Sequence, residues 1–469
     1  MSYLPKALIS KFNELANFSR EKISIVPSSG QTLVTAGQTV ILDLPYSSML
    51  ALDSLEMHFD FASTAGDDDT VINEVLYAPR NAASFIQGLE IRFNNAVVQN
   101  ITDYNFLHNK LSDYTSQEDS IKRRNVAGEN ADISTKFTTD ANGYVTGRTR
   151  GFAHAAAGVA KADRVDAKRM VVRSLLGFLS SNSVSVIDTG VVGNIQLRFF
   201  LAAPSVLIKS DGVQSAAASS APGGQAANKT YNLSNIEFKI TRMTFPSQYY
   251  ESAAAKLSSG IPTVMYFDDY QSFSGAMVSN TKTQQMRMTV SVNSIKYLMG
   301  TFVLANREVI GPCIVTDPRH DETLHSKFVA AKPQLLYNSS YFYSTGLGLT
   351  GSSWVIGSQR LPQNPSTNLD CFTNMGDVFN INQDSSLGVS PFISSLEGFT
   401  DGNFCDMLPL GYFNESEKIV CGLNTKNLPV AIIWETKSGN ATDQDCYPVV
   451  YVCTDKKITI HATQQIEID

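Results

Sequence analysis

Few residues of this chain have a type and spacing that could support chemistry, and a glycine-rich run is the first candidate. Gly346-Leu-Gly348-Leu-Thr-Gly351 has the spacing of a dinucleotide-binding fingerprint, which needs a following helix whose N-terminus faces a pyrophosphate. The residues that follow, up to Pro362, contain Pro and Gly and lack helical periodicity, so we interpret the run as a turn between strands. No Gly-Lys pair occurs in the chain, which excludes the usual phosphate-binding loop.

Residues that could bind a metal are scattered rather than clustered. The six cysteines all lie in the C-terminal half, and the closest two, Cys446 and Cys453, are farther apart than paired zinc ligands usually are. His320 and His325 do not share a helix face, and Asp67-Asp68-Asp69 is more typical of an exposed turn than of a cation site. We therefore predict no metal site and no cofactor, and we expect free thiols.

Catalysis has no local signature either. The chain lacks a Gly-x-Ser-x-Gly motif, and His58 and His461 lie on the polar faces of alternating segments, where a solvated imidazole is expected. Asp268 and Asp269 are adjacent in a strand-like segment, so they point to opposite faces and cannot form the paired carboxylates of a glycosidase. We predict that no residue is catalytic and that the protein is not an enzyme.

Composition narrows the class of protein further. The chain has 469 residues, of which 43% are hydrophobic and 17% charged, and its net charge is −7. Ordinary hydrophobicity with low charge excludes a disordered chain, and the acidic balance argues against binding nucleic acid along its whole length. The segment Met1–Lys22 has no unbroken apolar core, so we expect no secretion signal, and no run is long enough to span a membrane as a helix.

The dominant hydrophobic periodicity is two, which predicts strands with one face in a core and one in water. It recurs along the whole chain, at residues 55–61, 89–93, 195–199, 236–240, 286–292 and 457–461. Because each strand must bury its apolar face against another layer, the pattern predicts an all-β protein of stacked antiparallel sheets.

Helical signals are short and divide the chain. Residues 1–20 form a predicted N-terminal helical arm, with Leu8, Phe12 and Leu15 at helical spacing, and residues 102–112 form a second predicted helix. Residues 247–260, which Ser247 can N-cap, predict a linker helix between two β modules at 21–246 and 261–469.

Two segments of the first module are predicted to be insertions between its strands. The long insertion at about 118–173 carries eleven Lys and Arg against seven Asp and Glu, and the loop at 211–229 consists of small residues. An insertion of that length is usually functional or an assembly contact, although a solvated excursion is the alternative.

The centre of the chain resembles one family. Tyr231-Asn-Leu-Ser-Asn, then Tyr249-Tyr250-Glu251, then the segment Thr263–Phe273 ending in Tyr-Gln-Ser-Phe, is similar to the junction between the rolls of double jelly-roll major capsid proteins. The C-terminal segments 427–434 and 449–460 resemble the closing strands of the second roll. The resemblance is best to the proteins of polinton-like viruses and virophages, which are tailless icosahedral DNA viruses.

The resemblance implies two consecutive eight-stranded antiparallel jelly-roll β-sandwiches and a homotrimeric, pseudo-hexagonal capsomer. Its partners would be further copies of itself, neighbouring capsomers and penton or minor capsid proteins at the vertices, with a possible internal contact to the genome or a membrane layer. No small-molecule substrate is implied. The protein would lie in the virion, after assembly inside the host cell. A glycan-binding adhesin or lectin-like β-sandwich protein remains the alternative.

Overall fold

A computed structural model describes the strands of both halves of the chain. The described residues are, with short gaps, 19–64, 75–114, 168–210, 230–245, 259–276, 283–308, 313–315, 337–378, 396–411, 422–436 and 446–468. Residues 1–18 of the predicted arm, residues 118–167 of the predicted insertion, the loop 211–229 and most of the predicted linker helix 247–260 lie outside them. So do Asp67-Asp68-Asp69, His320 and His325.

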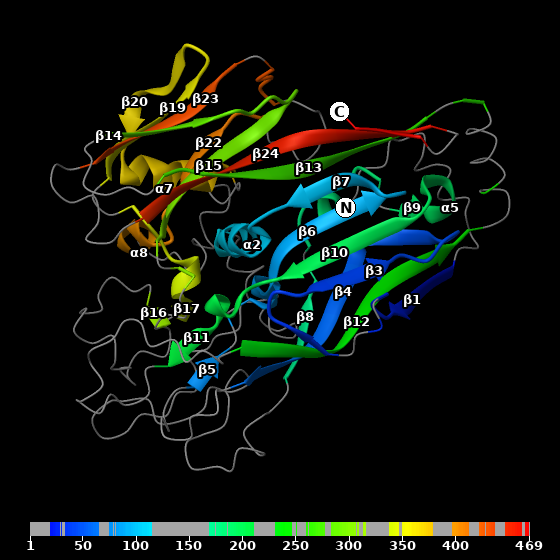
Figure 1. The fold of residues 1–469 in the computed structure, drawn as a ribbon. Coiled ribbons are helices and arrows are strands. Elements are labelled where there is room, and N and C mark those ends of the chain that lie inside the picture. The colour runs from blue at the N-terminus through cyan, green and yellow to red at the C-terminus, as the bar shows by residue number, and fades with distance from the viewer. Residues whose placement is uncertain are drawn as a thin grey trace.

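The first half of the chain forms two facing four-stranded antiparallel sheets (Figure 1). One has the order β1-β12-β4-β8, which are Ser19–Ile25, Thr230–Thr244, Met49–Thr64 and Lys168–Val172. The other has the order β3-β10-β6-β7, which are Thr39–Asp43, Ile195–Leu201, Ile86–Phe93 and Ala96–Ile101. Short strands add to this half: β2 (Leu33–Thr35) and β9 (Val186–Asp188) extend the first sheet, and β5 (Val75–Tyr77) pairs with β11 (Ile208–Ser210) in a separate two-stranded sheet.

The second half repeats this arrangement. One sheet contains β13, β24, β15 and β22 in that order, which are Thr263–Ser274, Cys446–Ile460, Ile295–Leu304 and Asp406–Pro409. The facing sheet has the order β14-β23-β19-β20, which are Thr283–Met288, Val430–Thr436, Leu349–Ile356 and Gln359–Ser366. The additional strands are β16 (Cys313–Val315), β17 (Tyr337–Ser339), β18 (Ser344–Thr345), β21 (Asp401–Gly402) and β25 (Ile466–Ile468).

The strand orders of the two halves are therefore the same. If the eight main strands of each half are numbered along the chain, both halves pair the first, eighth, third and sixth in one sheet and the second, seventh, fourth and fifth in the other. This is the strand order of a jelly roll, and two copies of it confirm the predicted fold class of two eight-stranded antiparallel sandwiches.

Helices are short and lie at the ends and edges of the sheets. The longest described ones are α2 (Tyr104–Asp113) and α7 (Asn368–Val378), and each follows the fifth strand of its sandwich. The others are α4 (Phe178–Ser181), α5 (Thr189–Val192), α8 (Leu396–Thr400) and the 3₁₀ turns η1 (Ala82–Phe85), η4 (Pro204–Val206) and η6 (Ser340–Phe342). No helix of the described residues is long and apolar enough to cross a membrane.

Most predicted strands and the helix at 102–112 are confirmed, and three boundaries are corrected. The strand predicted at 286–292 ends at Met288, and β1 begins at Ser19, inside the predicted arm. The predicted insertion at 118–173 extends too far, because its last residues form β8, a main strand of the first sandwich. Met170 and Val172 are fully buried in this strand. The prediction of a polar loop was wrong here because Lys and Arg residues flank the two apolar ones.

Candidate assembly surfaces

Those residues considered for chemistry that the structure describes do not come together. Among the described residues no three His, Cys, Asp or Glu side chains are close enough to hold a metal ion. Gly351 lies within β19, so a strand and not a helix follows the glycine-rich run. Asp268 contacts Lys296, whereas Asp269 points toward the first sandwich, which agrees with their predicted opposite directions. The four cysteines with described surroundings are free and buried.

Contacts between the two sandwiches form the first surface of interest, which we call the joint. Its centre is α2, which lies between the sandwiches (Figure 1) and whose described side chains are all buried. Lys110 Nζ donates a 2.7 Å hydrogen bond to Ser344 Oγ, and Tyr114, just after the helix, donates one of 2.8 Å to the carbonyl of Asn403. The ring of Phe106 stacks against Phe342 and Tyr451. One helix of the first sandwich is thus packed into the second.

The free edge of β13 is also covered at the joint. This strand is at the edge of its sheet, where unpaired backbone groups would be exposed. The chain after α4 runs beside it: the Ser183 amide donates to the Tyr266 carbonyl over 2.8 Å, and Ser183 Oγ accepts from the Tyr266 amide over 2.9 Å. Ser181 Oγ accepts from the Asp268 amide over 2.8 Å. The first sandwich therefore satisfies the backbone of the second sandwich's edge strand.

A polar cluster completes the joint beside these contacts. Gln99 Nε2 of β7 donates to Asp269 Oδ1 and to the Asp268 carbonyl, each over 2.9 Å. Lys456 Nζ of β24 donates to the Val98 carbonyl over 2.9 Å and lies 3.4 Å from Asp269 Oδ2. Because the Asp269 side chain is only 7% exposed, the paired lysine and amide offset the cost of burying its charge.

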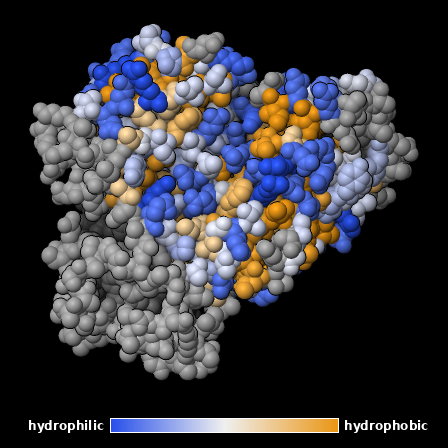
Figure 2. All heavy atoms as spheres, viewed as in Figure 1, coloured by the Kyte–Doolittle hydropathy of each residue, from blue (hydrophilic) through white to orange (hydrophobic). Residues whose placement is uncertain are grey.

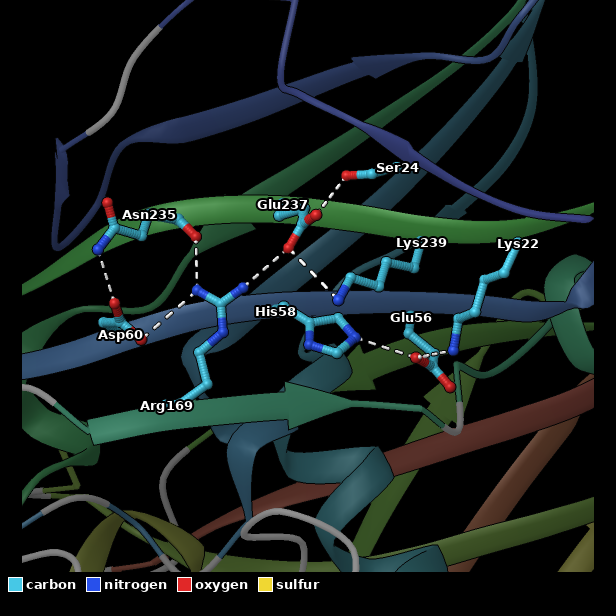
Figure 3. Close-up of polar contacts among 9 residues, drawn as sticks. All are labelled: Lys22, Ser24, Glu56, His58, Asp60, Arg169, Asn235, Glu237 and Lys239. Atoms are coloured by element: carbon cyan, nitrogen blue, oxygen red, sulfur yellow. Dashed lines mark hydrogen bonds and ion pairs between the residues drawn. The ribbon is translucent and has the colours of Figure 1, made fainter.

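The second surface is the outer face of the β1-β12-β4-β8 sheet, which carries a network of charged side chains that we call the ladder. It consists of Lys22, Ser24, Glu56, His58, Asp60, Arg169, Arg173, Asn235, Glu237 and Lys239, most of them drawn in Figure 3. At one end of the ladder, Arg169 of β8 joins residues of β4 and β12. Its guanidinium lies 3.0 Å from Glu237 Oε2 and 3.4 Å from Asp60 Oδ1, and it donates a hydrogen bond to the Asn235 carbonyl. Ion pairs thus cross three neighbouring strands.

Glu56 is the centre of the ladder's other end. Its carboxylate lies 2.7 Å from Lys22 Nζ, 3.0 Å from His58 Nε2 and 3.0 Å from Arg173 Nε, and its side chain is only 12% exposed. Burial alone would raise the pKa of Glu56, but the hydrogen bonds from Lys22 and His58 and the charge of Arg173 outweigh it and lower the pKa. Glu56 is therefore a stable carboxylate that joins β1, β4 and the end of β8.

His58 differs from its prediction as a solvated imidazole. Its side chain is only 12% exposed, within hydrogen-bonding distance of Glu56. Burial lowers the pKa of His58, the Glu56 carboxylate opposes that change, and the charges of Lys239 and Arg169 add to it. His461, in contrast, is half-buried, with a side chain that is 42% exposed, and lies 3.5 Å from Glu467.

An open hollow adjoins the Glu56 end of the ladder. It is lined by Arg20, Lys22, Asp53, Ser54, Glu56 and Thr241. Its lining combines two basic and two acidic side chains from β1 and β4 with two hydroxyl groups. Such a mixed surface offers hydrogen bonds to a polar surface of another protein and has no enclosed apolar cavity for a small ligand.

A buried polar cluster in the second sandwich lies beneath α7. Cys371 Sγ of that helix lies 3.6 Å from Asp406 Oδ1 of β22, and Asp406 is 2% exposed. Asp406 Oδ2 has no hydrogen-bond partner within the described part of the chain. Burial raises the pKa of Asp406 to about 6, and the nearby polar groups of Ser352, Cys371 and Trp354 offset this only in part. The cluster is enclosed, so it cannot meet a substrate.

Sequence reasoning did not identify either surface. For the joint, the sequence did contain one signal. Lys110 lies in a predicted helix beside the apolar residues Phe106, Leu107 and Leu111. If all sides of that helix are buried, the lysine needs a polar partner from another part of the chain. For the ladder, the alternation of acidic and basic residues on the polar faces of strands was visible, but the pairing of strands that brings them together was not.

Comparisons with known proteins agree with this architecture. A chain of the PBCV-1 virus capsid is 13% identical to this one, with 96% of each chain covered and a TM-score of 0.56. The Faustovirus major capsid protein is 10% identical, with 94% of this chain and 90% of that chain covered and a TM-score of 0.56. A chain of the Sputnik virophage structure is 9% identical, with 97% and 88% covered and a TM-score of 0.50. No family model and no curated protein sequence matches the chain.

These similarities extend over nearly the whole chain, so they include both sandwiches. The structural neighbours are double jelly-roll major capsid proteins, as the sequence resemblance predicted. The chain therefore has the double jelly-roll fold. At these identities the likeness establishes the fold, and the function is argued separately below.

Proposed function

We propose that this protein is a major capsid protein that forms homotrimeric, pseudo-hexagonal capsomers in the icosahedral shell of a DNA virus. The observation that carries the proposal is the repeat of one jelly-roll strand order in two sandwiches joined within one chain. The same fold over almost the full length of a PBCV-1 virus capsid chain and the Faustovirus major capsid protein supports it.

The physical properties of the molecule suit a structural role. The joint makes the two sandwiches one continuous hydrophobic core among the described residues, so each chain acts as a rigid double tile. The polar clusters found are either buried inside a sandwich or paired with one another, which favours an assembly protein over an enzyme. In this proposal the partners are further copies of the chain, vertex proteins, and the genome or a membrane layer inside the shell.

The proposal includes the division of the chain into parts. We propose that the arm predicted at 1–20 ends where β1 begins at Ser19, that the first jelly roll continues from there to 246, that 261–469 are the second jelly roll and that 247–260 link them. Pairing supports the division, because β1–β12 pair only with one another and β13–β25 pair only with one another. The arm would make lattice contacts, so its deletion is expected to leave capsomers intact and to impair shell formation.

The first test is the absolute mass of the purified protein by light scattering after size exclusion. The proposal predicts a species of three times 51.2 kDa, about 154 kDa, with a hexagonal outline in negative-stain images. A species of 51.2 kDa that persists at high protein concentration would contradict the capsomer. Glycan-array binding would then test the adhesin alternative.

A further inference from the structure

The polar cluster beneath α7 lies in the second sandwich, apart from the joint and the ladder. Cys371 Sγ of α7 donates to Asp406 Oδ1 of β22 over 3.6 Å and lies 3.8 Å from Ser352 Oγ of β19. These two strands belong to the two facing sheets of the sandwich, so a single thiol of the helix touches both sheets. All three side chains are at most 2% exposed.

The hydrogen bonds around Asp406 suit a neutral carboxyl group better than a carboxylate. An ionised carboxylate has two oxygens that each accept hydrogen bonds. Asp406 Oδ1 receives one from the Cys371 thiol, which is a weak donor, and Oδ2 has no partner within the described part of the chain. Burying a charge with so few partners costs free energy, so the packed position of α7 favours the protonated form of Asp406.

Beneath the helix, the neighbours of Asp406 supply no balancing cation. Its register partner on β15 is Gly300, which has no side chain. The thiol of the preceding residue, Cys405, faces Lys110 of α2, and burial raises the pKa of that thiol, so it stays neutral. Among the described residues Asp406 therefore has no ion-pair partner.

The other titratable groups around α7 do not balance the charge either. Burial and the Asp406 carboxyl group raise the pKa of Cys371, so this thiol also stays neutral. Asp370 of α7 accepts hydrogen bonds from the amide and the hydroxyl of Thr367 at the exposed start of the helix, each over 2.8 Å. Arg360 of the neighbouring β20 is paired with Glu435 over 3.0 Å at the surface.

The contact of α7 with its sandwich is small. Of its described side chains only Cys371 and Met375 are buried, and Phe372 adds an edge-to-face contact with Phe399 of α8. Leu369 on the opposite side is 56% exposed. Figure 2 shows hydrophobic residues (orange) interspersed with hydrophilic ones (blue) on the visible side of both lobes, so one exposed leucine does not by itself mark a docking site. A helix with so few buried contacts can separate locally while the strands stay folded.

We infer that Asp406 is a proton switch for α7. While its carboxyl group holds a proton, the helix stays packed on β22 and β19. When the proton passes to solvent, the helix separates from the sandwich at Cys371 and water reaches the carboxylate. The switch lies within a single chain, so it does not depend on the proposed capsomer.

The direction of the pH dependence follows from the pKa of Asp406. Burial raises this pKa to about 6 while α7 is packed, and contact with water would return it toward the ordinary 3.8. The proton therefore stabilises the packed helix fully below pH 3.8, and this stabilisation is lost as the pH rises through 6. Between pH 5 and pH 8 the equilibrium constant for separation of α7 should rise about tenfold.

Hydrogen exchange followed by mass spectrometry tests the switch in the full-length protein. The protection of the α7 amides, each referred to the rate of an unstructured peptide at the same pH, should fall about tenfold from pH 5 to pH 8 and stay below that of the β24 amides. Asp406→Asn, which cannot ionise, should show no such fall. Asp53→Asn removes an exposed carboxylate on the first sandwich and is the matched control, which should keep the fall.

Three results would overturn the switch. One is an α7 protection that does not change with pH in the unsubstituted protein, and another is the same fall in Asp406→Asn. The third is equal protection of α7 and β24 at pH 8, because the helix would then open only when the sandwich unfolds.

A second measurement needs no substitution. Cys371 and Cys453 of β24 are both buried, and local separation of α7 exposes only Cys371. Alkylation at pH 8 should therefore modify Cys371 faster than Cys453, as read from the masses of their peptides. Equal rates for the two thiols would again mean that α7 does not separate by itself.

Discussion

The outer face of the β13-β24 region and the outer face of the β1-β12-β4-β8 sheet occupy equivalent positions in two sandwiches with the same strand order. The first is covered within the chain, and its contacts are rings and a buried polar cluster: Phe267 meets Phe178 edge to face, and Asp269 is paired with Gln99 and Lys456. The second is open, and its residues form ion pairs such as those of Glu56 and Arg169. The kinds of side chain on a sheet face therefore depend on whether another part of the molecule covers that face, and not on the strand order of the sheet.

The largest expected effect comes from breaking the covered surface. Phe106 is fully buried in the joint, with ring centroids 6.5 Å from Phe342 and 6.1 Å from Tyr451, so Phe106→Ala should lower the free energy of unfolding by about 3–5 kcal/mol. Denaturant unfolding at a fixed protein concentration measures it. Phe200→Ala, at a ring that is 36% exposed on the first sandwich, is the control, and an equal loss in both variants would argue against the joint.

A comparable effect of opposite sign is expected at Asp406. Its folded-state pKa of about 6 lies above the ordinary 3.8, so the folded state holds this proton more tightly, and the resulting stabilisation, present below pH 3.8, is lost as the pH rises through 6. Asp406→Asn should therefore raise the stability at pH 8 by up to about 3 kcal/mol and change little near pH 4. Melting temperatures at the two pH values measure this.

The control for Asp406 is a substitution that removes the same charge at the surface. Asp53→Asn alters an exposed residue beside the ladder and should give nearly the same melting temperature as the unsubstituted protein at both pH values. If Asp406→Asn lowers stability at pH 8, the carboxylate has a stabilising partner and its burial is not costly.

A smaller loss in the free energy of unfolding is expected at Glu56 in the ladder. Glu56→Gln leaves Lys22, His58 and Arg173 without their carboxylate and should cost about 1–2 kcal/mol, between the values for exposed and buried pairs. Because the pKa of Glu56 is lowered, its contribution is present above the ordinary value of 4.5 and is lost as the pH falls through the lowered pKa. Urea unfolding should show a larger loss at pH 7 than at pH 3.

The smallest effect is expected at the exposed edge of the same sheet. Glu21 lies 2.7 Å from Arg242, but these side chains are 61% and 44% exposed, so Glu21→Gln should cost less than about 0.5 kcal/mol. The same urea measurement in 1 M salt should remove that small loss while part of the Glu56→Gln loss remains. Equal salt sensitivity of the two variants would mean that Glu56 is no better enclosed than Glu21.

Much of the fold could be predicted because strand periodicity is local. The alternation at 55–61, 89–93, 195–199 and 236–240 falls inside β4, β6, β10 and β12, since a strand must turn one side toward the core wherever it lies. The prediction failed at Lys168–Val172, where basic residues flank a short buried strand, and at residues 289–292, where apolar alternation continues after β14 has ended.

The candidate surfaces could not be predicted, because they depend on contacts between residues that are far apart in the chain. Glu56 and Arg173 meet only because β4 pairs with β8, and Lys110 meets Ser344 only because two sandwiches pack together. The strands, the helix after β7 and the resemblance that led to the fold could all be recognised in the sequence, because each depends on residues that are close together in the chain. Which polar faces are covered and which are open follows only from the packing of the two sandwiches. Hydrophobic periodicity reports the burial of a strand against its own sandwich, and it carries no information about which neighbouring surface covers the strand's other face.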